Sequence, residues 1–485
     1  MRRILYPYVY DPLVSGTDMT FHNEHVAVTR IAKFLPQIIA GFAGTLLAIS
    51  DGMTFAWTSP MTIYLTSKES HIKTTKEVVE WLETAFLCGC FCGIPITLYT
   101  VDKFGRKKSL VLVSVMMLVG WILIGLANKM IYIFAARVLA GIASNMVYVA
   151  CPMYNAEIAD EKIRGSLSAI MMVMDHAGSL IMYAIGPYTP FYTAPILGSV
   201  IVIFQIIVFS FMPDSPFYLI SAGKIADAHK ALSFFKPYKD ADDEINVISA
   251  SIETERREKE QKPSIFDTKV NRKVLTIITV LNLAPQMLGY SVIIMNLHII
   301  LKAAGSIYMD FSLAAITAGS IMLAATIFCS VSVDRFGRRI LLLVSSTISG
   351  CCVLALAIYF HLQALSYNMT PVSWIPVVSV FIFCLFFKIG IGIVPLIVNA
   401  EIAPGNIKAI AVTYGDGLKI VGSIIAVQIY QFVTKATGLY LPFYIYSCSA
   451  VVLGIFTFFW IPETKGHSLE EIQRIIKSHS VGKRY

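Results

Sequence analysis

The sequence predicts an all-α membrane protein with twelve membrane-spanning helices arranged in two six-helix halves. Of its 485 residues, 56% are hydrophobic and only 14% are charged, whereas about a quarter of a soluble chain is charged. A basic turn between apolar segments, Asp102-Lys-Phe-Gly-Arg-Lys-Lys108, recurs as Asp334-Arg-Phe-Gly-Arg-Arg339, 232 positions later (334 − 102). A soluble protein this apolar would expose large hydrophobic patches, so we expect a membrane protein whose repeat divides it in two.

The first half contains six apolar segments, each near the roughly 20 residues that span a bilayer. A polar amino-terminal tail, 1–34, precedes them. This tail lacks the continuous apolar core and the cleavage site of a signal peptide. The segments cover about 35–58, 84–101, 109–127, 131–153, 166–186 and 193–212. They predict a six-helix bundle over 35–212.

A charged stretch, 213–272, separates the halves. Its composition is typical of a solvated helix or a linker, so we expect a helical linker. The second half has apolar segments at about 274–301, 312–333, 340–361, 374–400, 409–434 and 441–461. They predict a second bundle over 273–461, and a charged tail, 462–485, follows. Gly390, Gly392 and Pro395 predict a flexible tenth helix, because glycine permits close packing and proline removes a backbone hydrogen bond.

Lysine and arginine are concentrated on one side of this predicted topology. Each half has an even number of spans, so both termini, both basic turns and the linker share a side. That side carries about 30 of the 39 basic residues. Cytoplasmic loops carry an excess of such residues, so we expect both termini in the cytoplasm. Basic residues at membrane edges fit a lipid bilayer and argue against a nucleic-acid partner.

Two further landmarks recur in the same order as the basic turns. Asn155-Ala-Glu-Ile-Ala-Asp160 returns as Asn399-Ala-Glu-Ile-Ala-Pro404, and Pro213-Asp-Ser-Pro216 returns as Pro462-Glu-Thr464. The two six-span repeats are therefore parallel. Parallel six-helix repeats are the architecture of major facilitator transporters, whose substrate site lies between the halves near the middle of the membrane.

Together these motifs resemble the sugar porter family of that superfamily. The matching landmarks are Asp102 with Gly105, Arg106 and Lys107; Arg137; Pro152-x-Tyr154-x-x-Glu157 with Arg164-Gly165; Pro213-Asp-Ser-Pro216; Asp334-Arg335 with Gly337, Arg338 and Arg339; Glu401; and Pro462-Glu463-Thr464-Lys-Gly466 with Leu469-Glu-Glu. The stretch 52–60 resembles insect facilitated trehalose transporters in particular. The resemblance covers about 35–475 and implies the major facilitator fold.

The resemblance also implies that charged landmarks form a cytoplasmic latch, which holds the outward-facing state and separates on inward opening. The turns need glycine for the reversal of the chain, and their basic residues meet the negative carbonyl ends of helices. Simple positive-inside anchoring is the alternative. The candidate latch residues are Asp102, Gly105, Arg106, Lys107, Glu157, Arg164, Asp334, Arg335, Gly337, Arg338, Arg339, Glu401, Lys408, Pro462, Glu463 and Thr464.

Ionisable residues within spans cost about 2.5–3.5 kcal/mol each on insertion scales and are candidates for function. Arg137 matches a family position that faces a protonatable aspartate in proton-coupled members, and Asp51 lies near that aspartate's place. The two side chains could pair, either as a coupling site for protons or as a fixed ion pair. Asp416 and Lys419 are one helical turn apart and could neutralise each other.

The positions that contact sugar in the family differ most from its pattern. The candidate substrate-binding residues are Met172, Asp175, His176, Gln286, Ser291, Lys388 and Asp416. Met172 and Lys388 replace a glutamine and a glutamate of the family, and Ser291 replaces an asparagine, whereas Gln286 is retained. The resulting pocket is more charged and less aromatic than sugar recognition requires, which favours considering other substrates.

We therefore expect a secondary transporter of the plasma membrane that moves a sugar, trehalose-like or hexose-like, by alternating access and facilitated diffusion. A transporter of a charged organic solute and a transporter-like sensor that does not transport remain alternatives. The sequence has no phosphate-binding Gly-x4-Gly-Lys-Ser/Thr and no nucleophile elbow, so we expect no enzyme and no cofactor. The nine cysteines lack metal-ligand spacing, so we expect no metal.

Overall fold

The structure is a computed structural model that describes residues 16–237, 240–260, 269–403, 408–465, 467, 471, 472, 474 and 475. Side chains are described from Lys33 onward, apart from those of residues 255, 258–260, 269, 331–336, 400, 408 and 409. The sequence-predicted tails 1–34 and 462–485 and the linker 213–272 thus lie partly outside the described residues.

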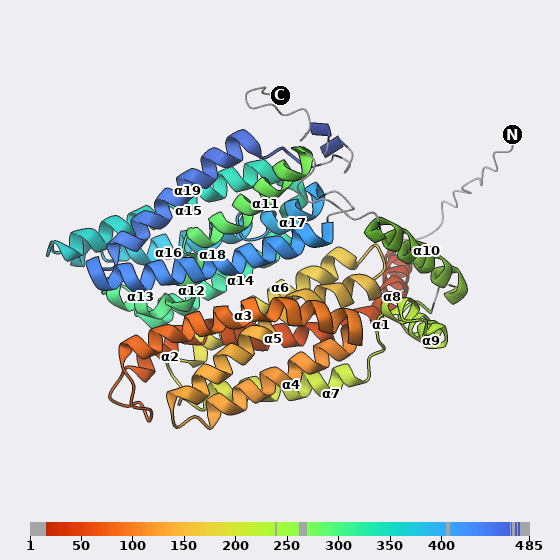
Figure 1. Ribbon diagram of the computed structural model, residues 1–485, viewed down its shortest axis with the longest axis horizontal. Helices are drawn as coiled ribbons and strands as arrows, with labels where there is room; N and C mark the ends of the chain where they lie inside the picture. Colours follow the sequence, from red (N-terminus) through yellow and green to blue (C-terminus); the bar gives the residue numbers. More distant parts are fainter. Residues whose placement is uncertain are drawn as a thin grey trace.

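Helices of the first half alternate in direction through the bundle (Figure 1). The first half contains α1 (Gly16–Ala56), α2 (Thr58–Leu65), α3 (Lys76–Phe104), α4 (Arg106–Gly125), α5 (Met130–Ile158), α6 (Arg164–Ile185) and α7 (Thr193–Ser210). The linker contains α8 (Pro216–Ser221), α9 (Ile225–Phe235) and α10 (Ala241–Glu260). These three helices lie together beside one end of the first half.

Helices of the second half repeat the pattern, with two spans built from shorter pieces. They are α11 (Lys269–Met287), α12 (Tyr290–Met295), α13 (Leu297–Ala304), α14 (Phe311–Phe336), α15 (Arg338–Ala364), a 3₁₀ turn (Thr370–Val372), α16 (Trp374–Ile389), α17 (Val394–Ile402), α18 (Lys408–Thr437) and α19 (Tyr440–Trp460). Twelve helical segments among the described residues are long and apolar enough to cross a membrane. The predicted all-α fold of twelve spans is confirmed.

The second span begins earlier than the sequence predicts, at Lys76 instead of 84. Its first two turns carry Glu77, Glu80 and Glu83, which made them read as part of a polar loop. These turns are helical because their polar groups face α18: the Gln431 amide donates to the Glu80 carbonyl oxygen at 2.7 Å. A partner helix from the other half thus stabilises a segment whose composition alone favours solvent.

The two halves lie side by side (Figure 1) and meet mainly along α6 with α14 and α3 with α18. Within the first half, α3 packs on α5 and α1 packs on α6; within the second, α15 packs on α19 and α11 on α18. We call the end of the bundle that holds the turns at Gly105 and Gly337 the basic-turn end. The opposite end, with the loops 66–75, 126–129 and 365–373, is the far end.

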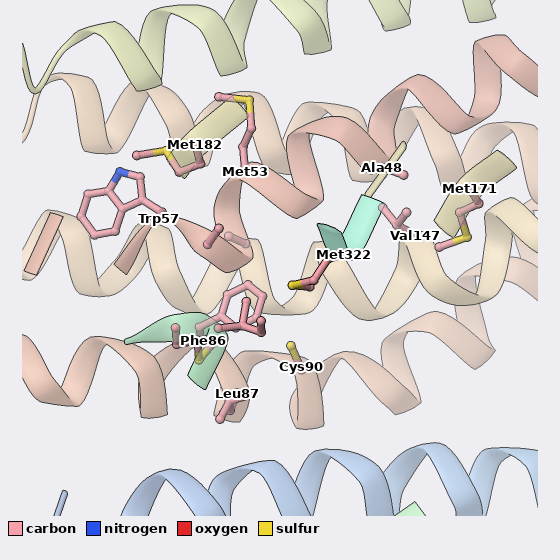
Figure 2. Close-up of a cluster of buried hydrophobic side chains, with 14 of the residues drawn as sticks. Ala48, Met53, Trp57, Phe86, Leu87, Cys90, Val147, Met171, Met182 and Met322 are labelled. Carbon is pink, nitrogen blue, oxygen red and sulfur yellow. The ribbon is translucent and has the colours of Figure 1, made fainter. Parts of the chain in front are cut away.

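The core between the helices is rich in methionine. Figure 2 shows Met53 of α1, Met182 of α6 and Met322 of α14 in one cluster with Trp57 and Phe86. Met322 comes from the second half, so the apolar core continues across the boundary between the halves. Unbranched methionine side chains adapt to irregular gaps, which suits an interface between two bundles.

Two spans of the second half are interrupted near the middle of the bundle. The seventh span turns at Gly289, whose φ of +82° favours glycine, and breaks again at Asn296. The tenth span breaks over 390–393, between α16 and α17. A Cβ added at Gly390 would lie 2.1 Å from the Ser345 hydroxyl oxygen, so glycine is required there. The glycines that predicted a flexible tenth helix thus coincide with an interruption of that helix.

Candidate functional site

Charged and aromatic residues of the first half meet at the centre of the bundle. Asp175 lies midway along α6 and is buried. The Tyr148 hydroxyl on α5 lies close to its carboxylate, and the His176 ring lies beside it, with Nδ1 3.6 Å from Asp175 Oδ2. His176 Nδ1 donates to the Met172 carbonyl oxygen at 2.7 Å, because the carbonyl can only accept. The predicted residues Met172, Asp175 and His176 therefore form one connected group.

Lys388 of the second half also lies at the centre of the bundle, on the side opposite Asp175. It occupies the last turn of α16 and is 7% exposed. Its ammonium lies 4.4 Å from the centre of the Tyr290 ring, and that ring stacks on Phe387 at 4.4 Å. The negative end of a helix and the face of an aromatic ring both stabilise a cation. Asp175 is the opposite charge that acts most strongly on Lys388, so this pair bridges the halves electrostatically.

A second lysine, Lys419 on α18, approaches the first half directly. Its ammonium lies 5.1 Å from the centre of the Tyr148 ring, and the residue is exposed although it lies well inside the span. Asp416, one turn away, is half-buried and attracted to Lys419. The described residues include no contact within 4.0 Å between these two charges, so their predicted neutralisation is at longer range.

Three neutral polar side chains form a buried trio next to Tyr290. The Ser291 hydroxyl donates to the Gln286 carbonyl oxygen at 2.9 Å and lies 3.0 Å from the Ser423 hydroxyl. Ser423 also lies 2.9 Å from the Gln286 carbonyl oxygen. The predicted residues Gln286 and Ser291 are thus brought together, with Ser423 as a partner that the sequence did not single out.

Asp51 and Arg137, the predicted pair, do not form an ion pair in this structure. Both are buried. The Arg137 guanidinium donates instead to the Thr54 carbonyl oxygen at 2.5 Å and lies 4.4 Å from the centre of the Phe86 ring. Asp51 lies close to Ser144, and its Oδ1 atom has no partner among the described residues. The backbone carbonyl and the aromatic ring stabilise part of the guanidinium, while its Nη2 atom has no partner among the described residues.

Hydrogen bonds between the halves gather at the far end, in a group that we call the far-end clasp. Ser59 of α2 accepts the His298 amide at 2.9 Å and contacts its Nδ1 atom at 2.8 Å. The Tyr183 hydroxyl donates to the Ile294 carbonyl oxygen at 2.9 Å, a group that the break at Asn296 frees from the helix. Other members join α3 to α18: Gln428 with Thr84, Gln431 with Glu80, and Lys435 with Glu77 and Glu80.

At the basic-turn end, the turns make ion pairs within each half. Arg106 contacts Glu157 of α5 at 2.7 Å, with side chains 8% and 14% exposed, and Glu157 also accepts from Ser215. Arg338 contacts Glu401 of α17 at 3.0 Å. The repeat in the sequence is thus a repeat in geometry. A latch between the halves stays a prediction, because both pairs tie helices of the same half.

The same turns are held by acidic residues from the repeated Pro-Asp/Glu motifs. Asp214 accepts the Lys107 amide at 3.1 Å, and Glu463 accepts the amides of Arg338 and Arg339 at 2.9 and 3.1 Å. Burial raises the pKa of Glu463, but backbone amides, including those of Lys465 and Arg338, outweigh it and hold the pKa below its usual value. Each carboxylate satisfies free amides at the start of a helix.

Other predicted latch residues make fewer contacts with charged side chains. Asp102 and Arg164 are exposed, and no ion pair joins either to another described side chain. Gly105 and Gly337 have φ of +85° and +81°, which explains the glycines. Pro462 and Thr464 are buried, and Glu463 is half-buried. The side chains of Asp334, Arg335 and Lys408 lie outside the described residues. Lys107 and Arg339 also donate to the last turns of α7 and α19.

Three residues of the centre were not predicted as site residues: Tyr148, Tyr290 and Ser423. Tyrosines and serines within apolar spans look like ordinary filling, and only their neighbours in space reveal them. Glu83 was also missed, because it preceded the predicted second span. It is 3% exposed and is within reach of Asn296 and Gln431 of the other half. Glu77, Glu80 and Glu83 follow one another at intervals of three residues, which was the available signal of a helical face.

The described residues include no group of three histidine, cysteine or acidic side chains placed to hold a metal ion. What the centre offers is a set of polar groups from both halves: ammonium, carboxylate, phenol, hydroxyl and amide. Such a set can bind a polar solute through hydrogen bonds and charge. It is also divided between two bundles, so any movement of one bundle against the other changes the site.

Comparisons with known proteins identify a family of transporters. The family model described as sugar (and other) transporter matches residues 37–476. The facilitated trehalose transporter Tret1 of Polypedilum vanderplanki is 28% identical over 447 residues, covering 90% of this chain and 87% of that protein. Tret1 of Bombyx mori is 26% identical over 474 residues, covering 96% and 92%.

Solved structures with the same fold include the xylose transporter XylE from E. coli. Its inward open conformation superposes with a TM-score of 0.74 at 19% identity, covering 90% of this chain and 98% of that one. XylE described as a proton:xylose symporter, bound to 6-bromo-6-deoxy-D-glucose, gives a TM-score of 0.69 at 20% identity, with coverage of 90% and 98%. At this identity the likeness concerns the fold.

Proposed function

Because the chain belongs to the sugar (and other) transporter family, we propose that it is a secondary transporter that moves a hydroxylated solute, a sugar of the trehalose or hexose type, across the plasma membrane by alternating access. The observation that supports this most directly is the division of the central site. Tyr148 and Asp175 come from one bundle, whereas Tyr290, Lys388 and Lys419 come from the other. A solute bound at the centre would therefore contact both halves and respond to their relative position.

The distribution of contacts between the halves fits one state of such a cycle. The far-end clasp closes one side of the centre, while the described residues show no hydrogen bond or ion pair between the halves at the basic-turn end. Lys419 is exposed in the middle of its span, as expected if the centre is reached from that end. The excess of basic residues supports a cytoplasmic position for the basic-turn end and both termini. The conformation is then inward-facing.

Transport is proposed to be facilitative, so that solute moves down its own gradient. Proton coupling in this fold would need a carboxylate whose protonation changes an ion pair between states. Asp51 is the candidate carboxylate, but it makes no ion pair with Arg137, whose guanidinium donates to a backbone carbonyl and faces an aromatic ring instead. The geometry thus gives no direct means for the protonation of Asp51 to release Arg137.

Uptake of labelled trehalose and glucose into proteoliposomes, with and without an imposed pH gradient, tests this proposal. We expect saturable uptake that stops at equal concentrations inside and outside, and that a pH gradient does not change. Asp51→Asn should retain at least half of the wild-type rate. Accumulation driven by a pH gradient and lost in Asp51→Asn would show proton coupling instead. A folded protein that binds solute but transports none would favour a sensor.

A further inference from the structure

The second half presents two ammonium groups to the centre with few acceptors to meet them. Lys388 is buried, and its ammonium faces the Tyr290 ring at 4.4 Å. Among the described residues, no hydrogen-bond acceptor and no ion-pair partner within 4.0 Å contacts this ammonium. A buried ammonium without acceptors is costly, since burial removes the water that would accept its protons. It is therefore a group prepared to take an acceptor from a ligand.

Lys419 adds to this need. Its ammonium lies over the Tyr148 ring at 5.1 Å and is close enough to Lys388 for the two charges to repel each other. An anion placed between them would turn that repulsion into two attractions. Carboxylates and phosphates are the ligands for which charge-assisted hydrogen bonds of this kind are strongest.

The nearby carboxylates do not occupy the position between Lys388 and Lys419 where an anion would bind. Asp175 is on the opposite half, with the Tyr148 hydroxyl close to its carboxylate and the His176 ring at its side. Asp416 lies on α18 one turn before Lys419 and contacts neither lysine within 4.0 Å. Buried Asp51 also attracts Lys419. None of these three carboxylates lies within 4.0 Å of either ammonium group, so they oppose the charge of the lysines while leaving both ammonium groups open to an anion.

Hydroxyl-binding groups stand next to the lysines. Tyr290 carries Lys388 on its ring, and the adjacent Ser291 belongs to the hydrogen-bonded trio with Gln286 and Ser423. A ligand with a carboxylate at the lysines and hydroxyls along its chain or ring would reach both. A neutral sugar would use the trio and leave the ammonium groups competing for hydroxyl oxygens, which are weaker acceptors than a carboxylate.

We propose that the preferred solute is a hydroxylated carboxylate, such as a sugar acid, whose carboxylate binds Lys388 and Lys419 and whose hydroxyls bind the Gln286, Ser291 and Ser423 trio. This inference rests on the proposed transport function and names the substrate class of the same site. A monovalent acid carried without a co-ion also moves charge, so its transport depends on membrane potential, whereas that of a neutral sugar does not.

Proteoliposomes loaded under a valinomycin potassium clamp test the proposal, with labelled glucuronate, gluconate, glucose and trehalose as solutes. We expect glucuronate or gluconate uptake at least tenfold faster than that of glucose. We also expect about tenfold accumulation of the acid for each 59 mV of inside-positive potential, the factor for one charge. Lys388→Met should reduce acid uptake at least tenfold, and Lys388→Arg should retain part of it.

Lys302→Met removes a lysine from an exposed site on the same half and serves as the matched control, with unchanged acid uptake expected. Elution as a single peak on size-exclusion chromatography establishes that each variant is folded. Rapid glucose or trehalose uptake without inhibition by either acid would overturn this inference while leaving the proposed transport function intact. Absence of uptake for all four solutes by folded wild-type protein would overturn both. Acid uptake that persists in folded Lys388→Met would refute the role of the lysine.

Discussion

At the scale of single residues, this protein keeps charges inside a membrane by giving each one a specific neighbour. Arg137 is buried against a carbonyl oxygen and the Phe86 ring, and Lys388 is buried against Tyr290. Arg106 is buried against Glu157. These neighbours have different effects. The Tyr290 ring leaves the N–H groups of the Lys388 ammonium free to donate hydrogen bonds, whereas the Glu157 carboxylate accepts hydrogen bonds from the Arg106 guanidinium. A cation on an aromatic ring can therefore still bind a ligand, whereas a cation paired with a carboxylate stabilises the fold.

Replacing Arg106 by alanine should destabilise the basic-turn end and abolish transport. Glu157 would keep its contact with Ser215 but lose its only described ion pair, and breaking a buried pair on one side costs about 3–5 kcal/mol. Thermal unfolding in detergent and uptake in proteoliposomes are the measurements, with surface expression as the check on membrane insertion. Arg257→Ala removes the arginine of an exposed pair on α10 and should change neither. Normal uptake by well-expressed Arg106→Ala would show that the pair is dispensable.

At the scale of elements, the repeated motifs explain how the helices that follow the basic turns begin. Asp214 and Glu463 come from segments far along the chain, yet each accepts the first amides of α4 or α15. Gly105 and Gly337 supply the positive φ that turns the chain immediately before those amides. The sequence repeat thus encodes a helix start completed by a distant carboxylate, once in each half.

Replacing Glu463 by glutamine should lower the free energy of unfolding by about 1 kcal/mol, the usual worth of a capping side chain. The pKa of Glu463 is held below its usual value, so its stabilisation is present above the ordinary pKa of the unfolded chain and is lost as the pH falls through the folded value. The difference in melting temperature between wild type and Glu463→Gln should therefore be full near pH 7 and shrink below about pH 4.5. Glu69→Gln in an exposed loop is the control. A difference independent of pH would contradict the capping role.

At the scale of the whole molecule, two six-helix bundles share one polar centre and are joined at one end by the far-end clasp. The far-end clasp uses the Ser59 hydroxyl, the Tyr183 hydroxyl and the amides of Gln428 and Gln431, whose individual bonds contribute about 0.5–1.5 kcal/mol each. Together these hydrogen bonds can hold the far end closed. Because each one contributes little free energy, they can also break one after another when the end opens. A larger apolar seal would resist opening.

Holding the clasp closed should stop transport. Cysteines at Thr84 and Gln428, whose side chains touch in this structure, can be joined by a short bis-methanethiosulfonate in a background without the nine native cysteines. We expect uptake to fall at least tenfold on cross-linking and to recover on reduction. The same reagent on Glu253→Cys with Arg257→Cys, one turn apart on α10, should have no effect. Unchanged uptake by the cross-linked protein would mean that the far end does not open during the cycle.

The sequence by itself determined the number of spans, the two parallel halves, the basic turns and the identity of most charges within the membrane, because apolar length, charge and repeats are properties of the chain alone. Only the tertiary structure decided which of these side chains meet. It separated Asp51 from Arg137, placed Lys388 on Tyr290, joined Gln286 to Ser291 and Ser423, and made the turns with Glu77, Glu80 and Glu83 helical. Each of these outcomes depends on how helices from distant parts of the chain pack and turn against one another, and no local pattern records that packing.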